Sequence, residues 1–236
     1  AVQFLSVIPL GRPGTFEPKT MISWFPVVGL LLGAVTVLGD MAAGWLWPRA
    51  VVSVLDVLLL IFLTGALHLD GLADTADGMY GGRPPEKALE IMKDSRVGAM
   101  GLVAVVSVLG VKAAGLAACD HDRWLFLLVI PALARSSTLF GFRFLPYGRP
   151  GGGTGHALFE HRLGFRDFRA VGLPIVLALL AGWRGVLVIL TFAGVTAVIL
   201  IFYKRRMGCI TGDMLGAMTE ITEAALFLAA ATGGGS

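Results

Sequence analysis

Long runs of apolar residues constrain the fold of this chain more than any other feature. A hydrocarbon core about 30 Å thick requires roughly 20 apolar helical residues to cross it. Runs that approach or reach this length cover residues 22–38, 51–67, 97–118, 124–142, 171–183, 186–203 and 214–231. Backbone polar groups in lipid must be satisfied within their own segment, so each run is predicted to be a helix. The sequence therefore predicts an all-α, polytopic integral membrane bundle of about seven transmembrane helices.

The sequence leaves two possible numbers of membrane crossings. Run 171–183 is short for a span, so six helices with a re-entrant or tilted last segment is the alternative. A soluble helical bundle is disfavoured because its helices would carry a polar stripe, and runs 97–118 and 124–133 have almost none. We expect one transmembrane catalytic domain over residues 1–232, and a short tail left by cloning at 233–236.

The distribution of basic residues predicts the orientation of the bundle. With the N-terminus inside and seven crossings, the outer connections contain only Arg49, Arg123 and Arg184, and most other basic residues fall in inner connections. This bias is what the positive-inside rule requires of short loops. It predicts that the long connections 68–96 and 143–170 face the cytoplasm from the inner membrane. It also accounts for the formal net charge of +3 without a nucleic-acid partner.

Two further patterns concern how the helices are held together. Gly29 and Gly33 form a GxxxG pattern, which predicts close packing of the first span against a neighbouring helix. Cys119 and Cys209 fall on opposite membrane faces in the predicted topology, so no disulfide is expected between them.

The most informative polar stretch is HLDGLADTADG at residues 68–78. Asp70, Asp74 and Asp77 are spaced i, i+4 and i+7, so they share one face of a helix. Three carboxylates at the end of a membrane span repel each other and require a positive partner. Oxygen ligands alone favour Mg²⁺, or Mn²⁺, over zinc. The alternative is a solvated face paired with Arg or Lys, but such a face would mix charges of both signs.

Two other stretches carry carboxylates at helical spacing. Glu90 and Asp94 are i and i+4, a pattern that an exposed amphipathic helix would equally show. Asp213 and Glu220 are i and i+7 at the start of the last apolar run, where carboxylates usually face the bundle interior. In the seven-span topology three groups all reach the inner face: the aspartates of residues 70–77, the pair Glu90 and Asp94, and Asp213. This arrangement favours a shared metal site.

Basic and glycine-rich segments complement these carboxylates. Arg135 lies within an apolar span, where an unpaired guanidinium is costly, and Arg149 lies in the glycine-rich stretch 146–156. Exposed backbone N–H groups beside an arginine form a plausible cradle for a pyrophosphate. His68 adjoins the acidic face and could orient an aspartate or assist proton transfer. Lys93, Arg96 and Gly212 complete the expected phosphate-binding set.

These motifs together resemble the cobalamin synthase family, whose members are also called adenosylcobinamide-GDP ribazoletransferases. The resemblance covers stretches 4–10, 25–33, 68–78, 90–98 and 211–223, in the expected order. HLDGLADTADG at 68–78 and TGDMLGAMTEITE at 211–223 are the most specific parts. The chain has Ser-Val at 6–7, where the family usually has Thr-Arg, and Gly-Cys at 208–209 instead of Gly-Gly.

The resemblance implies a magnesium-dependent membrane transferase of cobalamin biosynthesis. It implies transfer of the adenosylcobinamide-phosphate group from adenosylcobinamide-GDP to α-ribazole or its 5′-phosphate, with release of GMP. One carboxylate, or His68, would accept the hydroxyl proton, while Arg135 and Arg149 would hold phosphates. The expected metal ligands are Asp70, Asp74, Asp77, Glu90, Asp94, Asp213 and Glu220, and the first three are also expected to be catalytic.

Three other classes of membrane protein compete with this interpretation. A CDP-alcohol phosphotransferase of lipid synthesis also uses membrane-edge aspartates, but its motif has Arg where this chain has Asp74. A prenyltransferase that binds diphosphate through Asp-rich segments is a more distant rival. An ion transporter would place carboxylates near the bilayer midplane, typically in paired repeats, and no repeat is visible here.

Overall fold

The computed structural model describes residues 1–9, 17–149, 156–160 and 162–233, and this part of the chain is helical throughout apart from its connections. The helices are α1 (Val2–Leu5), α2 (Pro18–Ser23), α3 (Phe25–Ala43), α4 (Arg49–Thr64), α5 (Leu67–Met79), η1 (Tyr80–Gly82), α6 (Pro85–Ile91), α7 (Ala99–Ala117), α8 (Arg123–Phe144), α9 (His156–Phe159), η2 (Phe165–Val171), α10 (Gly172–Ala178), η3 (Leu179–Ala181), α11 (Trp183–Arg206) and α12 (Gly212–Ala230). The predicted all-α membrane bundle is confirmed.

Each of the seven apolar runs forms a helix, but the helices differ in length and polarity. Within the described residues, α3, α7, α8 and α11 are long and apolar enough to cross a membrane. The bent pair formed by α4 and the segment Leu67–Gly82 would make a fifth span, its two parts meeting at 92°. α12 has 19 residues but contains three carboxylates, and α10 has only seven residues. The predicted count of seven crossings stays a prediction.

α8 is the central helix of the bundle, since 89% of its most apolar stretch is buried inside the protein. The two glycines of the GxxxG pattern bring α3 against its backbone. A Cβ atom built on Gly29 would lie 2.4 Å from Ala132 Cα, and one on Gly33 would lie 2.4 Å from Leu128 O. The predicted close packing of this pair is confirmed.

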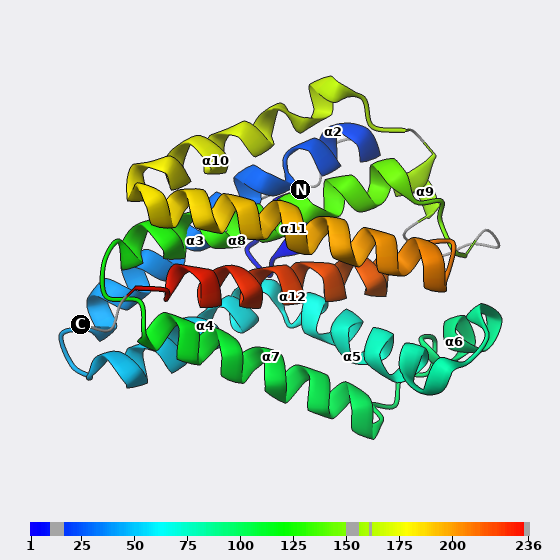
Figure 1. The fold of residues 1–236 in the computed structure, drawn as a ribbon, viewed down its shortest axis with the longest axis horizontal. Helices are drawn as coiled ribbons and strands as arrows, with labels where there is room; N and C mark the ends of the chain where they lie inside the picture. The colour runs from blue at the N-terminus through cyan, green and yellow to red at the C-terminus, as the bar shows by residue number, and fades with distance from the viewer. Residues whose placement is uncertain (10–16, 150–155, 161, 234–236) are drawn as a thin grey trace.

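The long connections gather at one end of the bundle. In Figure 1, α6, α9 and the first turn of α12 lie at the right-hand end, and α5 runs toward them. The short connections from α3 to α4, from α7 to α8 and from η3 to α11 lie at the opposite end. The elements that carry the predicted site residues therefore meet at one end.

Small residues allow α5 to cross α12 at close range. A Cβ atom on Gly71 would lie 2.6 Å from Asp213 O, and one on Gly216 would lie 3.1 Å from His68 O. The chain turns from α4 into α5 through Gly65 and Ala66, which both adopt the left-handed conformation. This sharp turn places the aspartate-bearing helix directly against the start of α12.

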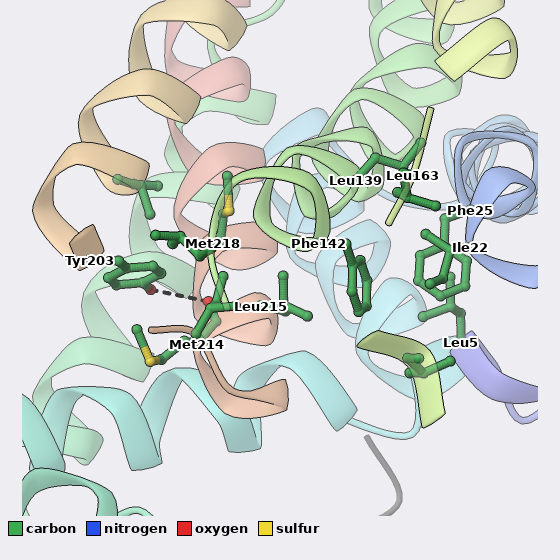
Figure 2. Packing of buried hydrophobic residues seen from close by; sticks show 14 of the residues in the cluster. Leu5, Ile22, Phe25, Leu139, Phe142, Leu163, Tyr203, Met214, Leu215 and Met218 are labelled. Atoms are coloured by element: carbon green, nitrogen blue, oxygen red, sulfur yellow. Dashed lines mark hydrogen bonds between the residues drawn. The ribbon is translucent and has the colours of Figure 1, made fainter. Parts of the chain in front are cut away.

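An apolar cluster packs beside this crossing and joins the N-terminal helices to the rest of the bundle. Figure 2 shows Phe142 of α8 with Leu215 of α12 on one side and Phe25 of α3 on the other. The hydroxyl of Tyr203 donates a hydrogen bond to Met214 O at 3.1 Å, so this buried phenol is satisfied. The cluster fixes α8, α11 and α12 around the end of the bundle that carries the site.

The contact between α3 and α8 leads to a stability prediction. Gly29→Ala forces a methyl group against the α8 backbone, which we expect to lower the free energy of unfolding by about 1–3 kcal/mol. Gly194→Ala is the control, because nothing lies within 4 Å of a Cβ atom at that position of α11. The measurement is the thermal unfolding midpoint of each protein in the same detergent. Equal midpoints for Gly29→Ala and the parent would contradict this packing.

Candidate active site

Four aspartates lie around the crossing of α5 and α12. Asp70 is exposed, Asp74 and Asp77 are half-buried on the following turns of α5, and Asp213 is half-buried in the first turn of α12. Asp74 interacts electrostatically with the other three carboxylates. The structure thus brings together the two motifs at residues 68–78 and 211–223, around a backbone contact between Gly71 and Asp213.

Arg149 is the basic residue that the structure places within this cluster. Its Nη2 donates to Asp213 Oδ2 at 2.6 Å and to Met92 O at 3.2 Å. Two backbone hydrogen bonds hold the arginine segment against the turn before α12, from Gly148 N to Ile210 O and from Ile210 N to Pro146 O, both at 2.9 Å. Residues 150–155, the rest of the predicted phosphate cradle, lie outside the described part of the chain.

Asp77 has a structural partner that the sequence did not predict. Its carboxylate accepts hydrogen bonds from Gly98 N at 2.6 Å and Gly101 N at 2.9 Å. These donors belong to the start of α7, where backbone N–H groups have no partner within the helix and the helix dipole favours a negative charge. Asp77 therefore caps α7 and links it to α5.

None of the residues predicted from the 90–98 stretch is paired with Asp213 within the described part of the chain, and two of them lie beside Asp77. Asp77, Asp94 and Arg96 line a separate, open hollow of about 410 Å³. Arg96 donates hydrogen bonds to Asp94, which lowers the pKa of that carboxyl to about 2. Glu90 is exposed and pairs with Lys87 at 2.9 Å. Lys93 is also exposed.

Glu220 and Arg135 belong to a different cluster, deeper in the bundle. Lys112 of α7 donates to both Glu220 and Glu223 of α12, and Arg135 of α8 pairs with Glu223 at 2.8 Å. All four side chains are almost fully buried. Glu220 follows Asp213 by two helical turns, about 10 Å along the axis. Each side chain is therefore already paired inside the bundle, and the roles of Glu220 as a metal ligand and Arg135 as a phosphate ligand stay predictions.

A cavity of about 290 Å³ opens beside the aspartate cluster. Its polar lining includes His68, Asp70, Arg149, Gly212 and Asp213, so five predicted site residues meet on one cavity. Most of the remaining lining is apolar and aromatic. His68 is 5% exposed, and its Nδ1 has no hydrogen-bond partner among the described residues.

The predicted magnesium site can be compared with these positions. Within the described residues, no group of three or more His, Cys, Asp or Glu side chains is placed to hold a metal ion. Asp213 is held by Arg149, and Asp77 by the start of α7. Asp70 and Asp213 line the cavity and Asp74 interacts electrostatically with both, and carboxylates are the ligand type that Mg²⁺ prefers. The donor chemistry fits, and metal binding stays a prediction.

Sequence reasoning missed two groups of residues, one inside the bundle and one at the cavity. Lys112 is one of them, and its burial between two glutamates explains why α12 tolerates these carboxylates. The aromatic lining of the cavity comes from Phe4, Phe25, Phe142, Tyr147 and Phe159. No periodic pattern connects these rings, since they come from separate segments.

The fold and the site define a class of protein: a helical membrane protein with an acidic, arginine-containing cavity at one end, which has the character of an enzyme active site. Comparison with known proteins makes the class specific. The family model described as cobalamin-5-phosphate synthase matches residues 1–231. No solved structure matches the chain.

Curated relatives are similar over almost the whole chain. An adenosylcobinamide-GDP ribazoletransferase of Syntrophobacter fumaroxidans is 38% identical over 98% of this chain and 96% of its own length. One from Roseiflexus sp. is 39% identical over 94% of this chain and 84% of its own length. One from Brevibacillus brevis is 31% identical over 97% of this chain and 94% of its own length. The chain belongs to the cobalamin-5-phosphate synthase family, which confirms the resemblance seen in its motifs.

The buried cluster of Lys112 leads to a second stability prediction. Lys112→Met leaves two carboxylates facing one arginine, and we expect it to lower the free energy of unfolding by about 3–5 kcal/mol. Lys112→Met combined with Glu220→Gln leaves only the Arg135–Glu223 pair, so it should recover much of that loss.

Lys87→Met is the matched control, because the pair that Lys87 forms with Glu90 is exposed and contributes less than about 1 kcal/mol. Thermal unfolding in detergent measures all three proteins against the parent. If Lys112→Met unfolded like Lys87→Met, the charge cluster would not contribute to the stability of the bundle.

Proposed function

We propose that this protein transfers the adenosylcobinamide-phosphate group of adenosylcobinamide-GDP to α-ribazole or its 5′-phosphate and releases GMP, in the last steps of cobalamin biosynthesis. One observation carries the proposal. In a chain that matches the family model from residue 1 to 231, the carboxylates of its two most specific motifs meet Arg149 at a single cavity.

Arg149 is the proposed contact for the pyrophosphate of the donor. It lines the cavity, and its guanidinium is positioned by Met92 O and by Asp213. A guanidinium donates parallel hydrogen bonds that match phosphate oxygens. Gly212 lines the same cavity at the start of α12, where the free backbone N–H groups of the first turn favour an anion.

The proposed metal ligands are Asp70, Asp74 and Asp213, and the proposed metal is Mg²⁺, with Mn²⁺ as a substitute. When bound, the metal supplies positive charge that neutralises the pyrophosphate and the departing GMP. Asp70 and Asp213 line the cavity and Asp74 interacts electrostatically with both, whereas Asp77 is held by the start of α7. The mutual repulsion of the three proposed ligands is a physical reason to expect a cation among them.

The reaction forms one bond and breaks another at the same phosphorus. A hydroxyl oxygen of the ribazole ribose attacks the phosphorus on the cobinamide side, and the bond from that phosphorus to the bridging oxygen of GDP breaks. GMP leaves with the electron pair of that bond. Asp70 lines the cavity and is exposed there, so we assign its carboxylate as acceptor of the hydroxyl proton.

The proposed location is the inner membrane, with the cavity facing the cytoplasm. Apolar helices of sufficient length support a membrane setting. The end of the bundle that carries the cavity also carries the long, basic connections, as expected for a cytoplasmic face.

The direct test is GMP release by purified protein in nanodiscs supplied with adenosylcobinamide-GDP, α-ribazole and Mg²⁺. We expect release to depend on α-ribazole, to stop with EDTA, and to fall about 100-fold or more in Asp74→Asn, which removes a carboxylate from the metal site. Asp122→Asn is the control, since Asp122 precedes α8 at the other end of the bundle. Absence of release by the folded parent protein would refute the proposal and favour a lipid phosphotransferase or a transporter.

Arg149 gives a second kinetic prediction. Arg149→Lys keeps the charge but not the planar guanidinium, and we expect it to raise the KM for adenosylcobinamide-GDP about tenfold, the effect of losing one charged hydrogen bond. The KM for α-ribazole should change much less. Arg143→Lys is the matched control, because Arg143 lies on α8 outside the cavity lining. An unchanged KM for the donor would show that Arg149 does not hold its phosphates.

A further inference from the structure

The cavity beside the aspartates is walled by aromatic rings that contact one another in series. The ring centroids of Phe4 and Phe25 lie 5.9 Å apart, and those of Phe25 and Phe142 lie 6.4 Å apart. Phe159 continues the series, with its centroid 4.6 Å from that of Phe142 and 4.8 Å from that of Tyr147. The rings come from α1, α3, α8, α9 and the connection after α8, so the fold brings five separate positions together.

A single buried imidazole interrupts this apolar wall. His68 lines the cavity, is 5% exposed, and has an Nδ1 atom without a hydrogen-bond partner among the described residues. Leaving a buried polar nitrogen unpaired is unfavourable, and such groups usually have a ligand or water as partner. Thr138 also lines the cavity, but its hydroxyl already donates to Arg135 O at 2.7 Å.

We propose that this cavity is the binding site for the benzimidazole ring of α-ribazole, stacked against Phe142, Tyr147 and Phe159, with its one free ring nitrogen hydrogen-bonded to His68 Nδ1. The inference rests on the proposed function and adds where the acceptor substrate binds. Flat aromatic ligands stack favourably on aromatic side chains with centroids about 4.5–7 Å apart. A neutral imidazole carries hydrogen on one of its two nitrogens, so it can donate to a ring nitrogen that only accepts.

The other ring systems of the reaction fit this cavity less well. The volume, about 290 Å³, is near the lower limit of about 300–1,000 Å³ for small-molecule sites, and it is too small for a corrin ring with its adenosyl group. Guanine carries several donors and acceptors around its edge. The phenylalanine rings that wall the cavity offer these groups no hydrogen-bond partner, and each group left unpaired weakens binding.

The positions of the charged residues agree with binding of the base against the aromatic rings. Asp70, Arg149 and Asp213 line the same cavity as the rings, so a base held by Phe159 and Phe142 has its ribose directed toward charged groups. The ribose hydroxyl would then lie near the carboxylate assigned as proton acceptor. His68 acts in this arrangement on the base and not on the reacting hydroxyl, so it is a residue that determines acceptor specificity.

The first test compares steady-state kinetics of Phe159→Leu with those of the parent. The substitution keeps apolar volume and removes the ring. We expect the KM for α-ribazole to rise about five- to tenfold, the range of one aromatic stacking interaction, while the KM for adenosylcobinamide-GDP stays within twofold. Phe144→Leu is the matched control, because Phe144 is 62% exposed at the end of α8 and does not line the cavity.

The kinetic outcomes separate the possible occupants. An increase only in the KM for adenosylcobinamide-GDP, or in the inhibition constant of GMP, would place guanine in the cavity and overturn the proposal. No change in either KM would overturn it as well. If Phe159→Leu does not fold, Phe4→Leu tests the same wall from α1, and the same outcomes apply.

The second test does not depend on turnover. Equilibrium dialysis of the parent protein with α-ribosides of benzimidazole and indole compares a ring that has the free nitrogen with one that lacks it. We expect benzimidazole to bind about fivefold more tightly, and His68→Phe to abolish that difference while still binding both ligands. If the parent protein binds both ribosides equally, the His68 contact is refuted. If it discriminates in this way but releases no GMP, the proposed function fails and the binding site stands.

Discussion

The buried charge cluster of Lys112, Arg135, Glu220 and Glu223 is the interaction on which the arrangement of the bundle depends. Two positive and two negative groups lie together in an interior where an unpaired charge would be very costly. They belong to α7, α8 and α12, so any sliding of one helix would separate a pair. This requirement fixes the register of α12, and with it the height at which Asp213 meets α5.

Close backbone contacts position α5 in addition to the buried charge cluster. Gly71 and Gly216 let α5 and α12 approach until backbone atoms touch, and Asp77 joins α5 to the start of α7 through two hydrogen bonds. The aspartate-bearing helix is thus held on both sides by backbone contacts instead of by long side chains. Among the described residues no hydrogen bond or ion pair engages the carboxylates of Asp70 and Asp74, which is what a binding role for carboxylates requires.

The sequence predicted the helical class, the close packing of Gly29 and the meeting of Asp70 with Asp213, because apolar runs, small-residue spacing and loop polarity are properties of single segments. It did not predict that Glu220 and Arg135 are paired inside the bundle, since helical periodicity tells which face a residue occupies but not which helix covers that face. Lys112, three turns into α7, forms the ion pair with Glu220, and no residue near Glu220 in the sequence indicates this pairing. The aromatic cavity could not be predicted for the same reason, because Phe4 and Phe159 line one cavity only after the chain has folded.

The charges around the cavity are mostly negative. The carboxylates of Asp70, Asp74 and Asp213 interact with one another, while Arg149 forms an ion pair with Asp213 at 2.6 Å. A pyrophosphate would add further negative charge to the same space and would compete with Asp213 for that guanidinium. Repulsion between like charges at these distances is large in a partly buried site. Donor and carboxylates can therefore occupy the cavity together only if additional positive charge enters with the substrate, and this is the physical basis for expecting a divalent cation there.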